Sequence, residues 1–404
     1  MAENTEKRRE RRSESRTMKR RRRNVLLLLG ELALCLVLGI GAVICQRTIN
    51  QMYSEELDDN VYIETLSPRK TDAPATSMSK SISEVTDASG NVIDRQESDI
   101  PVYTDPNEYR NFLILGLDTR MDPNELQNTD VIMIASLNNT TGEIKLVSVL
   151  RDTILRLEDG SITGRIYDKC NEQYYTGISQ TVSMINRNLG LDIKEYAVVT
   201  WYGVAMCINQ LGPIEMTIHN LQEMEWHQGY LRSTCEAIGI EYEPEVLWGT
   251  GDFMMDGPQV VAYCRIRYGG LNDWGRAKNQ REAVEKILNK AKEVAKAGDF
   301  NRILNCAETA LSNVKTNLSL PDVAFLASDI SRYKMAGSYQ FPAEGRFVTK
   351  EKVGNYDLSY PIVVNNFEYE VRELHKFLFP DLEYEPSEFI KEVSWQMYID
   401  RTGQ

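Results

Sequence analysis

The chain has 404 residues and a net charge of −13, and 42% of its residues are hydrophobic. This length can bury a sizeable core in one large or two small domains. The first 45 residues carry +6 and the other 359 carry −19, and so acidic a bulk excludes nucleic acid as the expected partner. A site for an anion would therefore need a local concentration of Arg.

The first predicted element is a membrane-spanning helix over residues 24–45. Residues 1–23 hold eleven Lys or Arg, and the run from Val25 to Cys45 is apolar except for Glu31. A helix of this length just crosses the hydrocarbon core of a bilayer, about 30 Å thick. Because basic residues stay inside, we expect a cytoplasmic stub, a single span in the cell membrane and an extracellular bulk. A cleaved signal peptide is the alternative.

The rest of the chain is predicted to form a stalk, one domain and a tail. The stalk covers residues 46–105, because segment 64–100 is rich in Ser, Thr, Asp and Pro and has few large apolar residues. The domain covers 106–380. Residues 381–404 form a C-terminal tail with no assigned structure.

The cysteines outside the span indicate neither a disulfide framework nor a zinc site. Their number is odd, their spacing is irregular, and the three His form no ligand cluster. We expect buried free thiols, with one disulfide as the alternative. The five are Cys170, Cys207, Cys235, Cys264 and Cys306.

The domain alternates short apolar runs with helical patterns. We expect strands near 112–115, 131–137, 144–150, 196–200 and 361–364, with a hairpin turn at Asn138–Glu143. Helices are expected over 179–189, 277–297, 301–335 in two pieces, and 369–379. This order predicts an α/β fold with a mixed central sheet flanked by helices.

Charged residues follow the first three strands at one predicted end of the sheet. An up-down-up arrangement places three Asp and two Arg there. The set can serve as a hard-cation site, Mg²⁺ by preference, beside Arg that hold phosphate oxygens; ion pairs that close loops are the alternative. Its members are Asp118, Arg120, Asp130, Arg151 and Asp152.

A second basic group lies before and within the long helix. Arg265 and Arg267 alternate, so on a strand both would point to one face. On a helical wheel Arg276 and Gln280 lie at the edge of the apolar stripe, which directs them inward near the helix N-terminus. An inward Arg needs an anion, either a ligand or the Asp set.

Six blocks in this order resemble the signature of the LytR–CpsA–Psr family, over about 106–380. They are 112–120, Thr129-Asp130-Val131-Ile132-Met133, Val147–Asp152, Lys169-Cys170-Asn171, Ala262–Arg267, and Asp273-Trp274-Gly275-Arg276 with Gln280. The resemblance implies an enzyme that moves a glycopolymer, such as teichoic acid or capsule, from a polyprenyl-pyrophosphate carrier onto peptidoglycan through a phosphodiester. It also implies an apolar cavity for the lipid tail.

The resemblance also assigns roles residue by residue. Asp118 and Asp130 match magnesium ligands. Gln280 matches a head-group contact, and Asp152 and Asp273 match acidic positions around the site. The Arg that match pyrophosphate-contacting or pocket-shaping positions are Arg120, Arg151, Arg265, Arg267 and Arg276.

The sequence departs from the family pattern at two positions. Asn128 and Asn279 stand where the family has Arg, and Arg281 is a possible compensating substrate contact. We expect Mg²⁺ and convergent Arg to stabilise the charge that develops as the pyrophosphate breaks, with Asp152 as the base for the acceptor hydroxyl. Two alternatives stay open: a lipid pyrophosphatase, and a non-catalytic protein that binds the lipid-linked polymer. A DNA-binding regulator is disfavoured.

Overall fold

The structure is a computed structural model that describes residues 55–63, 81–86, 92–98, 108–117, 122–158, 162–241, 247–267 and 273–403. These residues belong to one compact unit, Tyr53–Gln404. None of the helices in these ranges is both long and apolar enough to cross a bilayer. The predicted stub, 1–23, and the predicted span, 24–45, lie outside the described residues.

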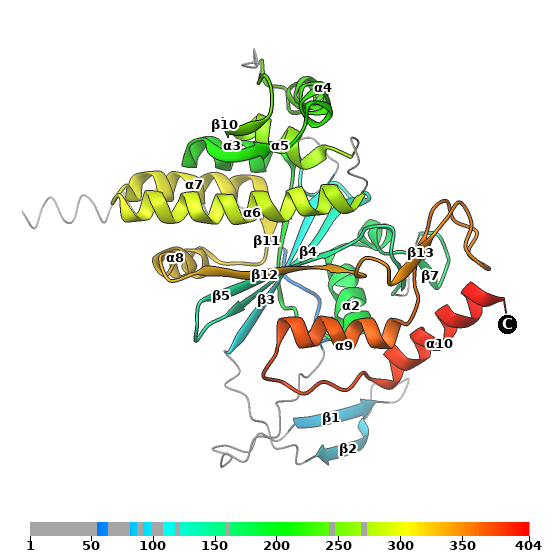
Figure 1. Cartoon of the computed structure of the whole chain (residues 1–404). Coiled ribbons are helices and arrows are strands. Elements are labelled where there is room, and N and C mark those ends of the chain that lie inside the picture. Colours follow the sequence, from blue (N-terminus) through cyan, green and yellow to red (C-terminus); the bar gives the residue numbers. More distant parts are fainter. Residues whose placement is uncertain are drawn as a thin grey trace, which may run out of the picture. The chain divides into compact units, whose positions relative to one another are not determined.

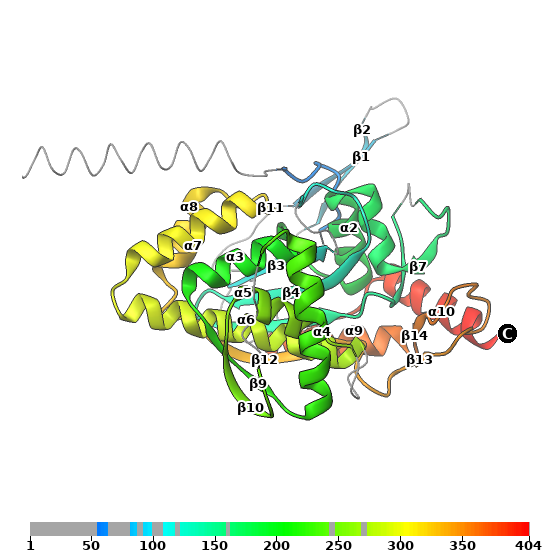
Figure 2. The ribbon, with the colours of Figure 1, turned by 90° about the horizontal axis from the view of Figure 1, so that it is seen from above.

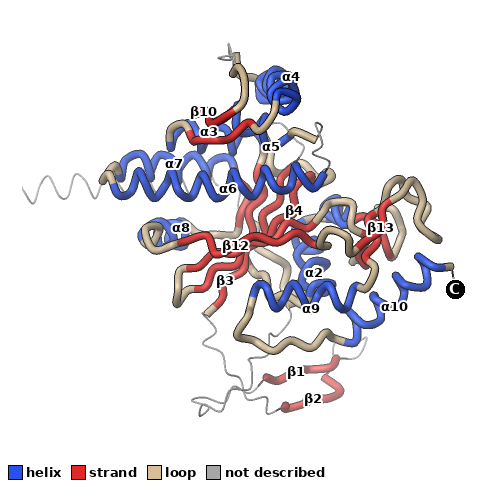
Figure 3. Tube along the Cα trace, viewed as in Figure 1, coloured by secondary structure: helices blue, strands red, loops and turns tan. Residues whose placement is uncertain are grey.

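A six-stranded mixed sheet occupies the middle of this unit (Figures 1 and 3). Its strand order is β11-β8-β3-β4-β5-β12. β3 and β5 both pair antiparallel with β4, as predicted, while β3–β8 and β5–β12 are parallel pairs. The mixed sheet is therefore confirmed. Its strands are Tyr109–Leu117 (β3), Thr129–Asn138 (β4), Glu143–Val149 (β5), Glu195–Val199 (β8), Val314–Thr316 (β11) and Lys334–Phe341 (β12).

The paired ends of β3 and β4 approach closely. Gly116 faces Val131, and Leu117 faces Thr129 after an irregularity in the register. A Cβ atom on Gly116 would lie 2.8 Å from the Cβ of Val131, so a larger residue would push the strands apart. Such irregularities redirect a strand end, and here the redirected end lies beside Asp130.

Helices on one face of the sheet complete the main apolar core. Alternate side chains such as Leu113 and Leu115 point to this face and are fully buried. They pack with helices α2 (Ile178–Leu189), α9 (Phe367–Leu378) and α10 (Glu388–Thr402). Gly190 ends α2 in the left-handed conformation, which glycine adopts without strain, as the sequence indicated.

A second group of helices lies on the other face (Figure 1). Here the strand residues between the core positions, such as Ile114 and Met133, face a cavity rather than a filled core. These helices are α3 (Trp201–Leu211), α4 (Leu221–Ile238), α5 (Gly257–Arg265), α6 (Asp273–Lys296), α7 (Phe300–Asn313) and α8 (Leu320–Ser328). The sheet is thus flanked by helices on both faces, as predicted.

Two segments outside the predicted domain pack on the main core. Residues 55–63, assigned to the stalk, place Leu57 and Val61 against it, and Ser179 accepts a hydrogen bond from the Asp58 amide. Helix α10 lies within 381–404, which had no assigned structure, and buries Ile390. Its periodic apolar residues and the cap by Ser387 are signals that the sequence carried.

Short elements complete the described chain. The strands among them pair in two-stranded antiparallel sheets, and η1 precedes α2. Their bounds are Ser81–Thr86 (β1), Val92–Ser98 (β2), Ile154–Arg156 (β6), Tyr167–Lys169 (β7), Cys170–Thr176 (η1), Ile214–Ile218 (β9), Gly251–Met255 (β10), Phe347–Thr349 (β13) and Ile362–Val364 (β14).

Candidate active site

An apolar cavity of about 450 Å³ lies between the sheet and helices α3, α5 and α6. Its walls are apolar over most of their area, and its polar lining includes one acidic residue, three Arg and one amide. The aliphatic residues include Ile114, Met133, Val204, Val261, Val284 and Ile287, and the polar ones include Asp130, Arg265, Arg267, Arg276 and Gln280. Such a lining suits a ligand with a long apolar part and an anionic head.

Three guanidinium groups converge on the carboxylate of Asp130. Arg151 bonds one carboxylate oxygen, while Arg267 Nη2 and Arg276 Nη1 lie 3.0 and 3.3 Å from the other. The Asp130 side chain is only 18% exposed. Burial raises the pKa of Asp130, but Arg276, Arg151 and Arg267 outweigh this effect, and the pKa is lowered. Asp130 is therefore ionised, and three guanidiniums surround its carboxylate.

The three Arg reach Asp130 from different elements. Asp130 is the second residue of β4, and Arg151 follows the end of the neighbouring strand β5. Arg267 comes two residues after α5, and Arg276 lies in the first turn of α6. The fold thus brings members of both predicted charged groups to one sheet end. The ion-pair alternative for Arg276 is also realised, since its partner is Asp130.

Hydrogen bonds from the first residues of η1 hold the turn that carries Arg151. The Cys170 thiol donates to the carbonyl oxygens of Leu150 and Arg151, at 3.4 and 3.3 Å. The Asn171 amide also donates to the Arg151 carbonyl oxygen. Burial raises the pKa of the Cys170 thiol strongly, so it serves as a neutral donor. These hydrogen bonds give the Lys169-Cys170-Asn171 block a structural role.

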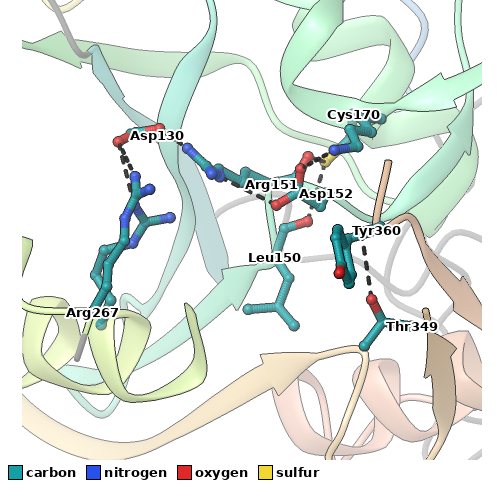
Figure 4. A network of polar contacts seen from close by, with 10 residues as sticks. Asp130, Leu150, Arg151, Asp152, Cys170, Arg267, Thr349 and Tyr360 are labelled. Carbon is teal, nitrogen blue, oxygen red and sulfur yellow. Dashed lines mark hydrogen bonds and ion pairs between the residues drawn. The ribbon is translucent and has the colours of Figure 1, made fainter. Parts of the chain in front are cut away.

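Asp152 lies on the far side of Arg151 from Asp130 (Figure 4). Lys169 Nζ is 2.7 Å from one Asp152 oxygen, and Arg151 Nε is 3.3 Å from the other. Lys169 was not among the residues predicted for the site. Its position next to Cys170 in a family block was the available signal. Arg151 bridges the two carboxylates and fixes their spacing.

Arg265 does not lie on a strand, so the argument that a strand would direct Arg265 and Arg267 to one face does not apply. It is the last residue of helix α5, and Arg267 lies in the following loop. The signal for this helix was the capping box formed by Asp256 and Gln259, with Pro258 at the first turn. Both Arg nevertheless line the cavity.

The Arg265 guanidinium is held by the cavity wall. It stacks 3.7 Å from the ring centre of Trp201 and 5.2 Å from that of Tyr230. Its Nη1 donates to Thr234 Oγ1 at 2.7 Å and to Ser233 Oγ at 3.1 Å. Trp201 and Tyr230 were missed from the sequence, because no local pattern links residues on α3 and α4 to Arg265. The resemblance gave Arg265 one of two roles, contact with the pyrophosphate or shaping of the pocket. These contacts support the second role.

Helix α6 presents Arg276 and Gln280 inward, as the helical wheel predicted. Arg276 is 5% exposed, Gln280 is half-buried, and Lys278 is exposed. Gln280 Nε2 donates to the Cys264 carbonyl oxygen at 3.3 Å, which joins α6 to α5 beside the cavity. Arg281 is half-buried on another side of the helix, and burial lowers its pKa. It is not among the described residues that line the cavity.

Three predicted site residues cannot be placed fully. Asp118 and Arg120 lie outside the described residues, and Asp273 begins α6 without a described side chain. Within the described ranges, no three His, Cys, Asp or Glu residues lie close enough to hold a metal ion. The roles of these three residues therefore stay predictions.

Comparison with known proteins decides the family. A model of the LytR_cpsA_psr family matches residues 71–363. The chain belongs to the LytR–CpsA–Psr family. The polyisoprenyl-teichoic acid–peptidoglycan teichoic acid transferase TagU of Enterococcus faecalis is 29% identical over 54% of this chain and 64% of its own length. Biofilm regulatory protein A of Streptococcus mutans is 26% identical over 61% and 59%. The chain thus spans about three fifths of the length of these curated relatives.

Solved structures show the same fold. The crystal structure of Bacillus subtilis TagT covers 70% of this chain and 94% of its own, with 19% identity and a TM-score of 0.51. That of protein gbs0355 from Streptococcus agalactiae covers 70% and 91%, with 19% identity and a TM-score of 0.53. The mixed sheet flanked by helices is therefore the fold of LytR–CpsA–Psr proteins.

The two departures from the expected family pattern lie beside the site. Asn279 is 3% exposed, and its side-chain amide donates to the Tyr263 carbonyl oxygen at 3.4 Å, which ties α6 to α5. The Asn128 side chain hydrogen-bonds Glu172. In this member of the LytR–CpsA–Psr family, both positions therefore carry structural contacts.

Proposed function

We propose that the protein is a phosphotransferase that moves a glycopolymer from a polyprenyl-pyrophosphate carrier onto peptidoglycan through a phosphodiester. The observation that carries this proposal is one carboxylate shared by three guanidiniums at an apolar cavity. The cavity suits the lipid tail, and the converging guanidiniums suit the pyrophosphate. Relatives named as teichoic acid–peptidoglycan transferases support the same reaction.

In this mechanism the Arg cluster stabilises charge at the breaking bond. Cleavage of the pyrophosphate increases negative charge on the leaving phosphate and on the oxygens of the transferred phosphorus. Arg267 and Arg276 lie at the cavity and can exchange part of their contact with Asp130 for phosphate oxygens. Donors already oriented in a buried site stabilise such charge without reorganisation.

Asp152 is the proposed base for the acceptor sugar hydroxyl. It lies next to Arg151, on the side away from Asp130 (Figure 4). Both of its oxygens contact cations, Lys169 and Arg151. To accept a proton it must first release one of them. The approach of a phosphate that draws Arg151 away would provide that release.

Magnesium is proposed to bind between Asp118 and Asp130. Leu117, which directly precedes Asp118, pairs with Thr129, which directly precedes Asp130. Asp130 is ionised and supplies the hard oxygen ligand that Mg²⁺ prefers. Bound there, the ion would supply neutralising charge to the pyrophosphate. A binding test independent of activity is Mg²⁺ titration by calorimetry, in which Asp118→Ala should abolish the binding heat.

The membrane location follows from the sequence expectation and stays part of the proposal. A substrate whose tail lies in the bilayer needs an enzyme held at the outer surface, and the predicted span at 24–45 would hold it there. A reporter fused after Gln404 should be accessible to external protease in intact cells. A reporter that is protected until the cells are lysed would contradict this orientation.

The decisive experiment incubates the full-length chain with radiolabelled lipid-linked glycan, peptidoglycan and Mg²⁺. We expect label in the peptidoglycan fraction, linked by an alkali-labile phosphodiester. Inorganic phosphate release without acceptor labelling would instead select a pyrophosphatase. Binding without turnover would select a non-catalytic protein. Transfer that persists in the Asp118→Ala variant and without Mg²⁺ would reject the metal-assisted mechanism.

A further inference from the structure

Helices α3 and α7 pack against each other on the cavity side of the sheet, with their backbones in close contact (Figure 2). The closest point lies at Gly203 of α3. A Cβ atom there would lie 2.8 Å from the carbonyl oxygen of Asn313, at the end of α7. Glycine at this position therefore permits the contact. Side chains that share the helix face of Gly203 are held against α7.

A pair of thiols lies on this contact. Cys207 is four residues after Gly203, and Cys306 is seven residues before Asn313, so each shares the face of the close contact. Cys306 Sγ is 3.7 Å from the Cys207 carbonyl oxygen. The two thiols also hydrogen-bond each other, which lowers the pKa of Cys306 and, with burial, raises that of Cys207. Both side chains are only partly buried.

We propose that Cys207 and Cys306 form an intramolecular disulfide that joins α3 to α7 when the protein meets a small-molecule or protein disulfide. The Cys306 thiolate attacks the oxidant disulfide and releases one thiol. Cys207 then attacks the mixed disulfide at the Cys306 sulfur, loses its proton and releases the second thiol. Two protein thiols are oxidised, and one oxidant disulfide is reduced to two thiols.

The other described cysteines explain why this pair is selective. Cys170 donates its thiol to two backbone carbonyl oxygens, and Cys264 contacts the Asn279 carbonyl oxygen at 4.0 Å. Burial raises the pKa of the Cys264 thiol to about 12, which makes it a poor first nucleophile beside Cys306, whose pKa is lowered. Cys235 lies on α4, packed with Leu231 and Ala262.

The disulfide would stiffen one wall of the cavity. Helix α3 begins at Trp201, which lines the cavity and stacks on Arg265. Cys207 lies less than two turns further along the same helix. A covalent link to α7 therefore restrains the helix that positions Arg265. The inference rests on the contact between α3 and α7 and does not require the proposed transfer reaction.

The test treats the full-length protein in detergent with oxidised glutathione, followed by alkylation and mass spectrometry of unreduced peptides. We expect a peptide pair that links Cys207 to Cys306, with a mass two hydrogens below the sum of the two reduced peptides. In Cys207→Ser, Cys306 should instead carry glutathione. Cys235→Ser is the matched control and should keep the linked pair.

A second measurement compares unfolding temperatures of the oxidised and reduced protein. Because the link would close a loop of about 100 residues, the oxidised form should unfold about 5 °C higher. The double variant Cys207→Ser/Cys306→Ser should show no such difference. Alkylation of both wild-type thiols after oxidation, or a stable glutathione adduct on Cys306 of the wild-type protein, would overturn the proposal.

Discussion

The two faces of the central sheet each bury a carboxylate, and the surroundings of the two differ in charge. On the α9 face, Glu370 accepts hydrogen bonds from Tyr339 at 2.7 Å, from the Ala343 amide at 2.6 Å and from Arg346 at 3.2 Å. One cation balances one anion there. On the cavity face, Asp130 meets three Arg. Asp130 therefore has a more basic surrounding than Glu370, which meets one Arg among the described residues, so the comparison separates a structural ion pair from a cluster suited to bind a phosphate.

The largest expected effect comes from removing one of the three cations at Asp130. Arg276→Gln should lower transfer activity about 10²- to 10³-fold, the effect of losing one preoriented donor. Stability should hold or rise, because two Arg still balance Asp130. Initial transfer rates and urea unfolding would be measured together.

Lys278→Gln provides the control for Arg276, since Lys278 is exposed on the same helix. It should leave both rate and stability unchanged. If Arg276→Gln loses enough stability to account for its loss of activity, the Arg276 cation is structural. The two faces of the sheet would then not differ in function.

The second prediction concerns the apolar residues of one strand. Leu115→Ala should reduce the free energy of unfolding by about 3 kcal/mol, because Leu115 is fully buried in the filled core. Ile114→Ala, one residue away, should reduce the free energy of unfolding by much less, since Ile114 already faces the cavity. It should instead weaken binding of a prenyl-tailed substrate. Equal losses of stability would mean that the cavity face is packed as tightly as the core.

The third prediction tests the balanced carboxylate. Glu370→Gln should lower the free energy of unfolding by about 2 kcal/mol, because a buried charge-assisted acceptor is lost. Activity of the folded fraction should stay at the wild-type level. Glu344→Gln, at an exposed residue near the same loop, is the control. A specific loss of turnover in Glu370→Gln would link the α9 face to catalysis.

Much of this contrast could be predicted from the sequence, and the reasons are local. The apolar runs and the turn at Asn138–Glu143 indicated the β3–β4–β5 pairing, which places Asp130 beside Arg151. The periodicity of α6 placed Arg276 inward. Both patterns depend only on the regular spacing of side chains along an element.

The remainder depends on contacts between distant segments. The pairing of Lys169 with Asp152, and the stacking of Arg265 between Trp201 and Tyr230, join residues that no periodic pattern connects. Helix α5 was not predicted, because its nine residues are too few for a clear period. Its capping box was present in the sequence, but a capping box marks only the start of a helix.

The smallest expected effect is the acid sensitivity of Asp130. Its pKa is lowered because Arg276, Arg151 and Arg267 together outweigh burial, which acts in the opposite direction. The folded state therefore binds fewer protons than the unfolded state, whose Asp titrates near pH 3.9. The stability that ionised Asp130 contributes is complete above that pH and is lost as pH falls through the lower folded value.

The acid effect can be isolated with Asp130→Asn, which removes the Asp130 charge from the three Arg at every pH. Urea unfolding between pH 6 and 3 should show a wild-type advantage that is constant near neutrality and narrows only below about pH 4. Glu344→Gln should follow the wild-type curve. If the advantage already narrows at pH 5 to 6, burial dominates and the pKa of Asp130 is raised, so the three Arg would not outweigh burial and the contrast with Glu370 would be lost.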